Sequence, residues 1–301
     1  MNALSAPRRR LHPTDSDLTF LEPADHLDPT QRRDRLTQAG YLWLRGLIPA
    51  GLCLAARDEI IARLVQHGSL DPIRPAAELP WAEGRAIAPQ FQETRDRQPA
   101  VTAAVQCAEV RSAIEALLQG PAEPSVYLWT RPVPPGVATG VHIDQVYMGL
   151  GSPRILTTWC CLDAVPRPRG GLAVMPGSHR AGELARLRET YGASDVDRDQ
   201  VEGTFDESPV DFRRRYGDPW GGTWATAEFG VGDVMIFGMF LVHASVVNAS
   251  DRYRLSCDAR WTPTGEPMDP RWFGPAPLGH HNGRPKSKPT SMTEARQRWG
   301  V

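Results

Sequence analysis

The sequence predicts a mainly β protein with flanking helices, whose core is an antiparallel sandwich or barrel. From residue 124 onward, short runs rich in β-branched and aromatic residues alternate with turns that contain Pro or Gly. Before residue 120, apolar residues recur with helical spacing instead. Apolar residues make up 41% of the 301 residues, which is enough to bury a sizeable core.

Helices dominate the N-terminal part of the chain. The spacing of apolar residues and the residues at the ends predict three helices, at 28–40, 49–67 and 100–119. Asp28 is suited to cap the first helix, and Gly68 to end the second. Residues 41–48 form an apolar strand between them. Residues 69–98 are rich in Pro, Arg and Glu and show no clear period.

The predicted β core spans residues 124–262. Its strands are expected, in order, at 125–132, 141–150, 154–165, 171–177, 223–229, 233–239, 240–247 and 253–261. A polar insert at 182–222 interrupts them, and such a long insert is usually a functional lid or a covering loop.

The remaining segments complete one domain. We expect residues 28–301 to form a single domain, with a helical part at 28–120 ahead of the β core. Residues 1–27 read as a polar arm rather than a core element, and residues 263–301 as a surface wrap.

Charge and cysteine content exclude several classes of protein. The 34 basic and 35 acidic side chains leave a formal net charge of -1, which predicts neither nucleic acid nor an anionic membrane as partner. The five cysteines are odd in number and contain no CxxC, so they predict free thiols in a reducing compartment. No apolar leader or membrane-length stretch occurs. We therefore expect a soluble, cytoplasmic protein with a small-molecule partner.

A candidate metal site lies in the β core. On a strand, His142 and Asp144 would point to the same face, and His243 on a later strand is the best third ligand. Two imidazoles and one carboxylate on one face leave three coordination positions open, which suits Fe(II). The same HxD pattern occurs in His26-Leu27-Asp28, but there Asp28 is expected to cap a helix, so that copy is set aside.

An arginine follows the second histidine. If Arg254, eleven residues after His243, lies on the next strand, a hairpin brings its guanidinium near the metal pocket. A guanidinium binds a carboxylate with two parallel hydrogen bonds. Arg252 and Arg260 alternate with Arg254 on the same face, so the spacing does not choose among the three. The alternative is a surface arginine beside Asp251.

Five short motifs together resemble the phytanoyl-CoA dioxygenase family of 2-oxoglutarate oxygenases. They are VHIDQ (141–145), GGLAVMPGSH (170–179), GDVMIF (232–237), HAS (243–245) and RLS (254–256). The resemblance covers about residues 125–262 and implies a double-stranded β-helix, or jelly-roll, core.

The resemblance also implies roles for particular residues. His142, Asp144 and His243 correspond to the iron ligands of the family. Arg254 and Ser245 correspond to residues that bind the side-chain carboxylate of 2-oxoglutarate. Trp159 and Tyr127 fall near positions that line the co-substrate pocket. The lysine that the family often places upstream of the metal motif is missing here.

The implied activity is that of an Fe(II)/2-oxoglutarate-dependent dioxygenase. It would consume O₂, form succinate and CO₂, and hydroxylate an unactivated C–H bond of a small metabolite. Asp144 argues against halogenation, because a halogenase keeps that coordination site free for chloride. Two alternatives are a cupin-like metalloenzyme that does not use 2-oxoglutarate and a non-catalytic jelly-roll binding module. Arg254 argues against the first, and metal analysis would test the second.

Several other residues allow two interpretations. His179 either faces the pocket or makes a structural hydrogen bond. Trp220 and Trp224 either close over the substrate or pack the insert onto the core. Asp233 is expected to form a turn, and the adjacent His280 and His281 are not expected to bind metal.

Arginines are also frequent in the segments 69–98 and 182–222. They suggest an acidic small molecule as substrate. Because acidic residues are interleaved with them, a solvated charged surface is the alternative.

Overall fold

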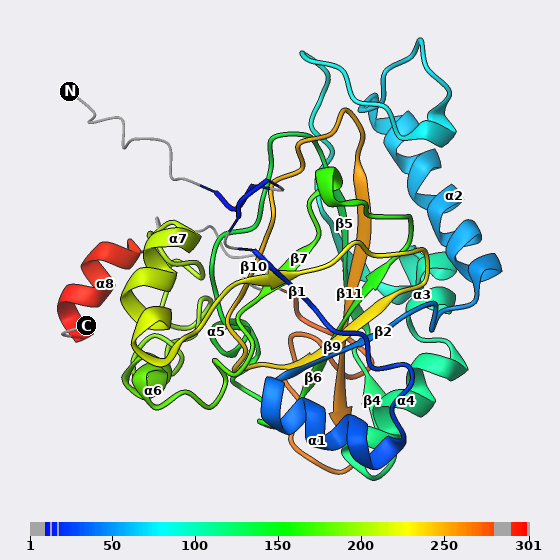
Figure 1. Cartoon of the computed structure of the whole chain (residues 1–301). Helices are drawn as coiled ribbons and strands as arrows, with labels where there is room; N and C mark the ends of the chain where they lie inside the picture. Colours follow the sequence, from blue (N-terminus) through cyan, green and yellow to red (C-terminus); the bar gives the residue numbers. More distant parts are fainter. Residues whose placement is uncertain (1–9, 13, 17, 280–289, 300–301) are drawn as a thin grey trace, which may run out of the picture.

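Two β-sheets form the centre of the molecule, with helices on both sides (Figure 1). The computed structural model describes residues 10–12, 14–16, 18–279 and 290–299. The larger sheet has the strand order β2-β9-β6-β11-β5-β3, with β4 pairing on β11, and the smaller has the order β1-β8-β7-β10. Apart from the parallel pair β1–β8, the strands pair antiparallel. The predicted mainly β core with flanking helices is confirmed.

The strands are short, as expected for a core punctuated by turns. The larger sheet contains β2 (Tyr41–Leu44), β3 (Phe91–Thr94), β4 (Ala122–Pro124), β5 (Tyr127–Val133), β6 (Leu156–Cys161), β9 (Val234–Gly238) and β11 (Arg254–Pro263). The smaller contains β1 (Thr19–Phe20), β7 (Leu172–Val174), β8 (Ala225–Thr226) and β10 (His243–Ser245).

Four helices cover the outer face of the larger sheet. They are α1 (Pro29–Ala39), α2 (Ala50–His67), α3 (Pro99–Val105) and α4 (Ala108–Leu118). Asp28 caps α1 through a capping box, and Gly68 ends α2 with a positive φ of 73°, as predicted. Apolar side chains of the helices, such as Ile60 and Ile114, pack on alternate residues of β11, such as Leu255 and Trp261.

Shorter helical segments belong mainly to the loops and the insert. The α-helices are α5 (Gln145–Met148), α6 (Ala185–Glu189), α7 (Pro209–Phe212) and α8 (Met292–Trp299). The 3₁₀ turns are η1 (Ala76–Glu78), η2 (Arg95–Arg97), η3 (Arg167–Arg169), η4 (Gly182–Leu184) and η6 (Asp218–Trp220), and η5 (Arg213–Gly217) is a π turn. Among the described residues, no helix is long and apolar enough to cross a membrane.

Strand β11 separates an apolar layer from a polar one. All ten of its residues are buried. Because side chains alternate along a strand, Leu255, Cys257, Ala259 and Trp261 join the helical core, and Arg254, Ser256, Asp258 and Arg260 face the other way. Buried charged groups require partners or a ligand. The polar face of β11 therefore marks where a site is to be sought.

The insert packs against the segment that carries the HxD motif. Val141 and Ile143 belong to a core cluster with residues of the insert, among them Tyr191, Phe205 and Phe212. His142 and Asp144 alternate with these two residues and point to the opposite side, toward the cavity. The insert thus supports the motif from behind.

Four sequence-based expectations for the fold are wrong in detail. Residues 141–150 do not form one strand, because His142 makes an isolated bridge and the chain then turns into α5. The expected helix 100–119 is two helices, because Cys107 has an extended backbone and starts α4. The segment 69–98 contains an unpredicted strand, β3. The arm 1–27 contributes β1, which pairs with β8, and Leu11, Leu18, Leu21 and Ala24 are buried among its described residues.

Candidate metal centre and co-substrate pocket

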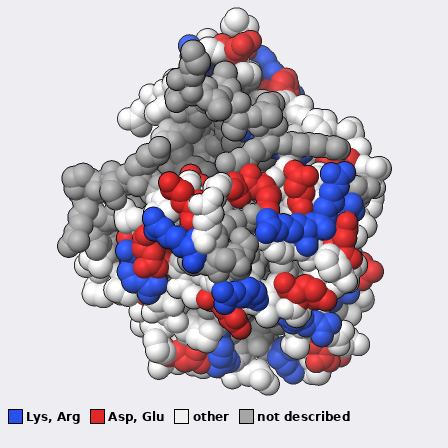
Figure 2. Space-filling model, turned by 90° about the vertical axis from the view of Figure 1, so that its left-hand side faces the viewer, with Lys and Arg blue, Asp and Glu red and all other residues white. Residues whose placement is uncertain are grey.

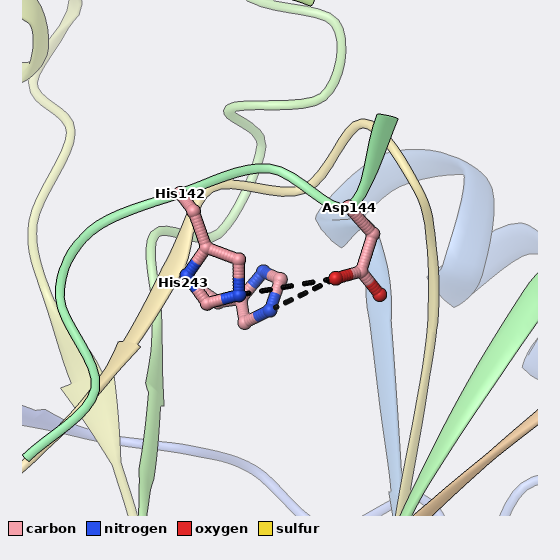
Figure 3. Close-up of side chains that lie close together, drawn as sticks. All are labelled: His142, Asp144 and His243. Atoms are coloured by element: carbon pink, nitrogen blue, oxygen red, sulfur yellow. Dashed lines mark ion pairs between the residues drawn. The ribbon is translucent and has the colours of Figure 1, made fainter. Parts of the chain in front are cut away.

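Two histidines and one aspartate converge in the interior between the sheets (Figure 3). His142 and His243 face each other across a bridge in which each backbone N–H donates to the other residue's carbonyl at 3.0 Å. Asp144 lies at the start of α5, and its Oδ1 is 3.8 Å from His142 Nε2 and 3.6 Å from His243 Nε2. One candidate ligand atom from each residue lies within 4.8 Å of the other two. The sequence-predicted triad is therefore brought together.

Backbone carbonyls orient both imidazoles. His142 Nδ1 lies 2.9 Å from the Gly140 carbonyl oxygen, and His243 Nδ1 lies 2.9 Å from that of Leu241. Since a carbonyl only accepts, each Nδ1 carries the proton and each Nε2 keeps its lone pair. This is the tautomer that a metal-binding imidazole requires, with its other nitrogen held by a hydrogen bond.

The aspartate is oriented through its second oxygen. The Thr157 hydroxyl donates to Asp144 Oδ2 at 2.8 Å, and Arg260 Nη2 lies 3.2 Å from the same oxygen. Oδ1 is thereby left directed at the histidines. Thr157 and Arg260 come from adjacent strands, where they are register partners.

The electrostatics keep the triad in its ligand form. Burial lowers the pKa of His142, and the neighbouring His243 lowers it further. Burial likewise lowers the pKa of His243. For Asp144, burial raises the pKa, but Arg260 and the two histidines outweigh it, so the pKa lies below its usual range. At neutral pH the site thus offers two neutral imidazoles and one carboxylate, the donor set expected for Fe(II).

An inner cavity connects the triad with the polar face of β11. Its wall consists of Arg131, Thr139, His142, Asp144, Thr157, Trp159, Leu172, Phe237, His243, Ala244, Ser245, Arg254, Asp258 and Arg260. Three of the four residues predicted to bind 2-oxoglutarate, Arg254, Ser245 and Trp159, are in this set.

Arg254 is a buried cation that reaches this cavity. It is 2% exposed, its Nη1 donates to the Gly170 carbonyl oxygen at 2.6 Å, and its Nε has no hydrogen-bond partner. Among the described residues, no carboxylate lies within ion-pair distance of it. Burial lowers its pKa to about 10, so the guanidinium stays charged at neutral pH. A buried, unpaired guanidinium in a cavity fits a ligand that brings its own carboxylate.

The structure also distinguishes the three arginines, Arg252, Arg254 and Arg260, among which the spacing did not choose. Arg252 lies at the surface, where it pairs with Glu78 and Asp251. Arg254 lies at one end of the polar face of β11, and Arg260 lies at the other end beside Asp144. The alternative of a surface Arg254 is therefore wrong.

Of the other predicted pocket residues, Ser245 and Trp159 line the inner cavity and Tyr127 does not. The Ser245 hydroxyl oxygen accepts the backbone N–H of Thr139 at 2.7 Å, which leaves its own proton available to a ligand. The Trp159 ring lies 5.7 Å from the Arg254 guanidinium carbon. Tyr127 is placed elsewhere: its ring packs with Trp129 and Trp272, and its hydroxyl donates to the Gln92 carbonyl oxygen. It does not line the inner cavity.

The other residues weighed in the sequence make structural contacts where the structure describes them. His179 Nε2 lies 3.0 Å from the Thr37 carbonyl oxygen. The Trp220 indole donates to Tyr216 and the Trp224 indole to Pro209, so both pack within the insert region. Asp233 accepts hydrogen bonds from Trp43, Gly46 and Gly230 across a turn. His280 and His281 lie outside the described residues, and Asp28 is engaged as a helix cap.

Acidic neighbours pair with most of the arginines of the insert. The pairs are Arg198–Asp199, Arg213–Asp218, Arg214–Asp211 and Arg215–Glu207. On the face shown in Figure 2, basic and acidic side chains lie next to one another rather than in a patch of one sign. The solvated charged surface fits this segment better than an anion-binding lid.

Sequence reasoning missed five polar residues of the cavity: Arg131, Thr139, Thr157, Asp258 and Arg260 as a neighbour of Asp144. Arg131 Nε pairs with Asp258 Oδ2 at 2.7 Å. The signal that could have found the three charged ones is a charged residue inside an apolar strand, as in WTRPV at 129–133.

Comparisons with known proteins agree with this arrangement. The family model "Phytanoyl-CoA dioxygenase (PhyH)" matches residues 36–256. A search of curated proteins returned no match.

Three solved structures illustrate the shared fold. The carbocyclase SnoK from nogalamycin biosynthesis is 18% identical, with 89% of this chain and 95% of that chain covered and a TM-score of 0.58. The epimerase SnoN, in complex with Fe³⁺, alpha ketoglutarate and nogalamycin RO, is 19% identical, with 86% and 96% covered and a TM-score of 0.56. EctD from S. alaskensis, with 2-oxoglutarate and 5-hydroxyectoine, is 18% identical, with 95% and 97% covered and a TM-score of 0.57. The predicted double-stranded β-helix core is confirmed.

Proposed function

This chain belongs to the phytanoyl-CoA dioxygenase family of Fe(II)/2-oxoglutarate-dependent oxygenases, and we propose that it hydroxylates an unactivated C–H bond of a small metabolite. The balanced reaction converts the substrate, O₂ and 2-oxoglutarate into the hydroxylated product, succinate and CO₂. The family match disfavours both alternatives, a cupin-like enzyme without 2-oxoglutarate and a non-catalytic binding module. The buried free cysteines fit a reducing compartment, and we propose the cytoplasm.

One observation carries this proposal: three candidate metal ligands and an unpaired buried guanidinium line the same cavity. His142, Asp144 and His243 would hold the iron. Arg254 and Ser245 would hold the far carboxylate of 2-oxoglutarate. The iron, once bound with 2-oxoglutarate and O₂, supplies the oxidation.

The chain's own residues set the conditions for that chemistry. The carbonyls of Gly140 and Leu241 hold the histidines in the correct tautomer. Thr157 directs one oxygen of Asp144 toward them. The triad side chains are at most 9% exposed, so bulk water is largely excluded from the reaction.

The aspartate favours oxygen insertion over halogenation. Asp144 occupies the position that a halogenase would leave to chloride. Hydroxylation is the simplest outcome for a site with this ligand set, and desaturation, ring closure and epimerisation are the outcomes against which it is tested. Hydroxylation adds one oxygen atom from O₂ to the product, and the other three do not.

The first experiment measures succinate. Protein loaded anaerobically with Fe(II) should convert 2-oxoglutarate to succinate when O₂ is admitted. Asp144→Ala should abolish this conversion, and Asp251→Ala, which changes an exposed aspartate, should retain it. Circular dichroism and the unfolding temperature show whether each variant is folded. A folded Asp144→Ala protein with full activity would contradict the ligand assignment.

The second experiment separates the reaction types. A metabolite that stimulates succinate release is incubated with isotopically heavy O₂, and the product is analysed by mass spectrometry. One heavy oxygen in the product supports hydroxylation. A product without heavy oxygen, formed with stoichiometric succinate, would refute hydroxylation. The same result would still support a reaction that depends on 2-oxoglutarate.

A further inference from the structure

A second, outer cavity also reaches the triad. It is lined by Gln90, Gln92, Trp129, Arg131, Thr139, His142, Asp144, Tyr147, Met148 and Arg260. The outer cavity has a volume of about 190 Å³, and the inner cavity has a volume of about 30 Å³. Arg254, Ser245 and Trp159 line only the inner cavity of these two. His142 and Asp144 thus line both cavities, and the outer cavity, which lacks the residues assigned to 2-oxoglutarate, is available to a substrate.

Arg260 lines both cavities and is the least satisfied group in the wall of the outer one. Its side chain is 4% exposed, and Nη2 is 3.2 Å from Asp144 Oδ2. Its Nε and Nη1 are buried and have no hydrogen-bond partner. The guanidinium carbon lies 4.7 Å from the centre of the Trp129 ring. Buried donors without acceptors are costly and uncommon, so two on one side chain point to an acceptor that binds there.

The neighbouring arginine is already neutralised. Arg131 Nε pairs with Asp258 Oδ2 at 2.7 Å, and its Nη1 donates to Gln90 Oε1 at 3.0 Å. Arg260 instead shares Asp144, whose other oxygen is directed at the histidines. Iron(II) would be balanced by Asp144 and the near carboxylate of 2-oxoglutarate, and Arg254 by the far carboxylate. One positive charge, that of Arg260, is then left without a counter-ion.

We propose that the substrate carries a carboxylate or phosphate group, which binds to Nε and Nη1 of Arg260 in the outer cavity. Trp129 packs beside this group, and the cavity opens past the exposed side chain of Gln90. The proposal rests on the proposed function for the identity of the site. The proposed anion site is therefore on β11 and not in the arginine-rich insert. The Arg260 guanidinium on β11 is buried and lacks a full set of hydrogen-bond partners.

The test uses the full chain with Mn(II) and saturating 2-oxoglutarate, so that the inner cavity is filled and no turnover occurs. Isothermal titration compares benzoate and phenyl phosphate with the neutral analogue benzamide. At least one anion should bind tenfold or more tightly than benzamide, and the stronger anion indicates whether a carboxylate or a phosphate is preferred. If neither anion binds more tightly than benzamide, the proposal is overturned.

Variants assign the binding to Arg260. Arg260→Gln should weaken binding of the preferred anion at least tenfold and change 2-oxoglutarate affinity less than threefold. Arg260→Lys keeps a cation beside Asp144 but lacks the two free N–H donors, so it serves if the glutamine variant does not fold; it too should lose anion binding. Unchanged anion binding, or a tenfold loss of 2-oxoglutarate affinity instead, would overturn the proposal.

The same titrations distinguish this failure from failure of the proposed function. Absence of 2-oxoglutarate binding by the Mn(II)-loaded protein would contradict the proposed function. The anion titration is therefore repeated with Mn(II) but without 2-oxoglutarate in Arg254→Met, which removes the other unpaired buried cation of the site and keeps Asp144 engaged by the metal. If the Arg254→Met protein binds the anion and the added Arg260→Gln substitution abolishes this binding, the anion site stands independently of the co-substrate assignment. If the Arg254→Met protein does not bind the anion, the proposal is overturned.

Discussion

Replacing Arg254 by methionine should weaken 2-oxoglutarate binding by about 100-fold or more. The side chain is 2% exposed and has no carboxylate partner among the described residues, so it is available to a carboxylate ligand. Removing one member of a buried charge pair costs about 3–5 kcal/mol, because the other charge stays buried without a partner. At 1.4 kcal/mol for each factor of ten, this corresponds to roughly 10²- to 10³-fold or slightly more in Kd.

Isothermal titration of 2-oxoglutarate into anaerobic, Mn(II)-loaded protein measures this change. Arg252→Met is the matched control, because Arg252 lies two residues earlier and is partly exposed in ion pairs with Glu78 and Asp251. Exposed pairs contribute little, so the Kd of the control should stay within about twofold of the wild-type value. The Arg254→Met protein should also keep its unfolding temperature without ligand, since an unpaired buried charge is replaced by an apolar side chain. A Kd within threefold of wild type for Arg254→Met would refute the assignment.

Three further predictions concern the supports of the site and the fold. Thr157→Val removes the hydroxyl that orients Asp144 and should lower Mn(II) affinity by about 10- to 100-fold; unchanged affinity in a metal titration would contradict this role. Asp233→Ala leaves three N–H groups without their acceptor and should lower the free energy of unfolding by about 3 kcal/mol, against about 1 kcal/mol for the cap variant Asp28→Ala; denaturant unfolding should rank them in this order. Burial raises the pKa of Cys53 to about 11, so it stays a protonated thiol at pH 8 and, like the four other buried cysteines, should react with a thiol reagent only after denaturation; rapid reaction of native protein would contradict this.

The sequence predicted the correct metal triad, but the backbone that holds it is only partly the one expected. Alternation on a strand was expected to align His142 with Asp144. In the structure, His142 is held by its bridge to His243, and Asp144 starts a short helix. The side chains converge because Val141 and Ile143 are buried against the insert on the opposite side. Side chains at 141–144 therefore do alternate between the two sides, as predicted, although this segment is not a regular strand.

The polar wall of the cavity could not be predicted in the same way. Which charges meet depends on the register of three strands: Arg131 lies opposite Ser256 on β11, and Arg260 lies opposite Thr157 on β6. Register is determined by packing across both faces of the sheet, which a single sequence does not display. The packing of the insert against the segment that carries the motif depends on the same tertiary contacts.

The most direct test of the site is a crystal structure of the protein grown without O₂, with Mn(II) and 2-oxoglutarate. Anomalous scattering should show one manganese ion bonded to Nε2 of both histidines and to Oδ1 of Asp144, and the far carboxylate of 2-oxoglutarate should contact Arg254. A manganese position away from His243, or a co-substrate that does not reach Arg254, would contradict the site described above.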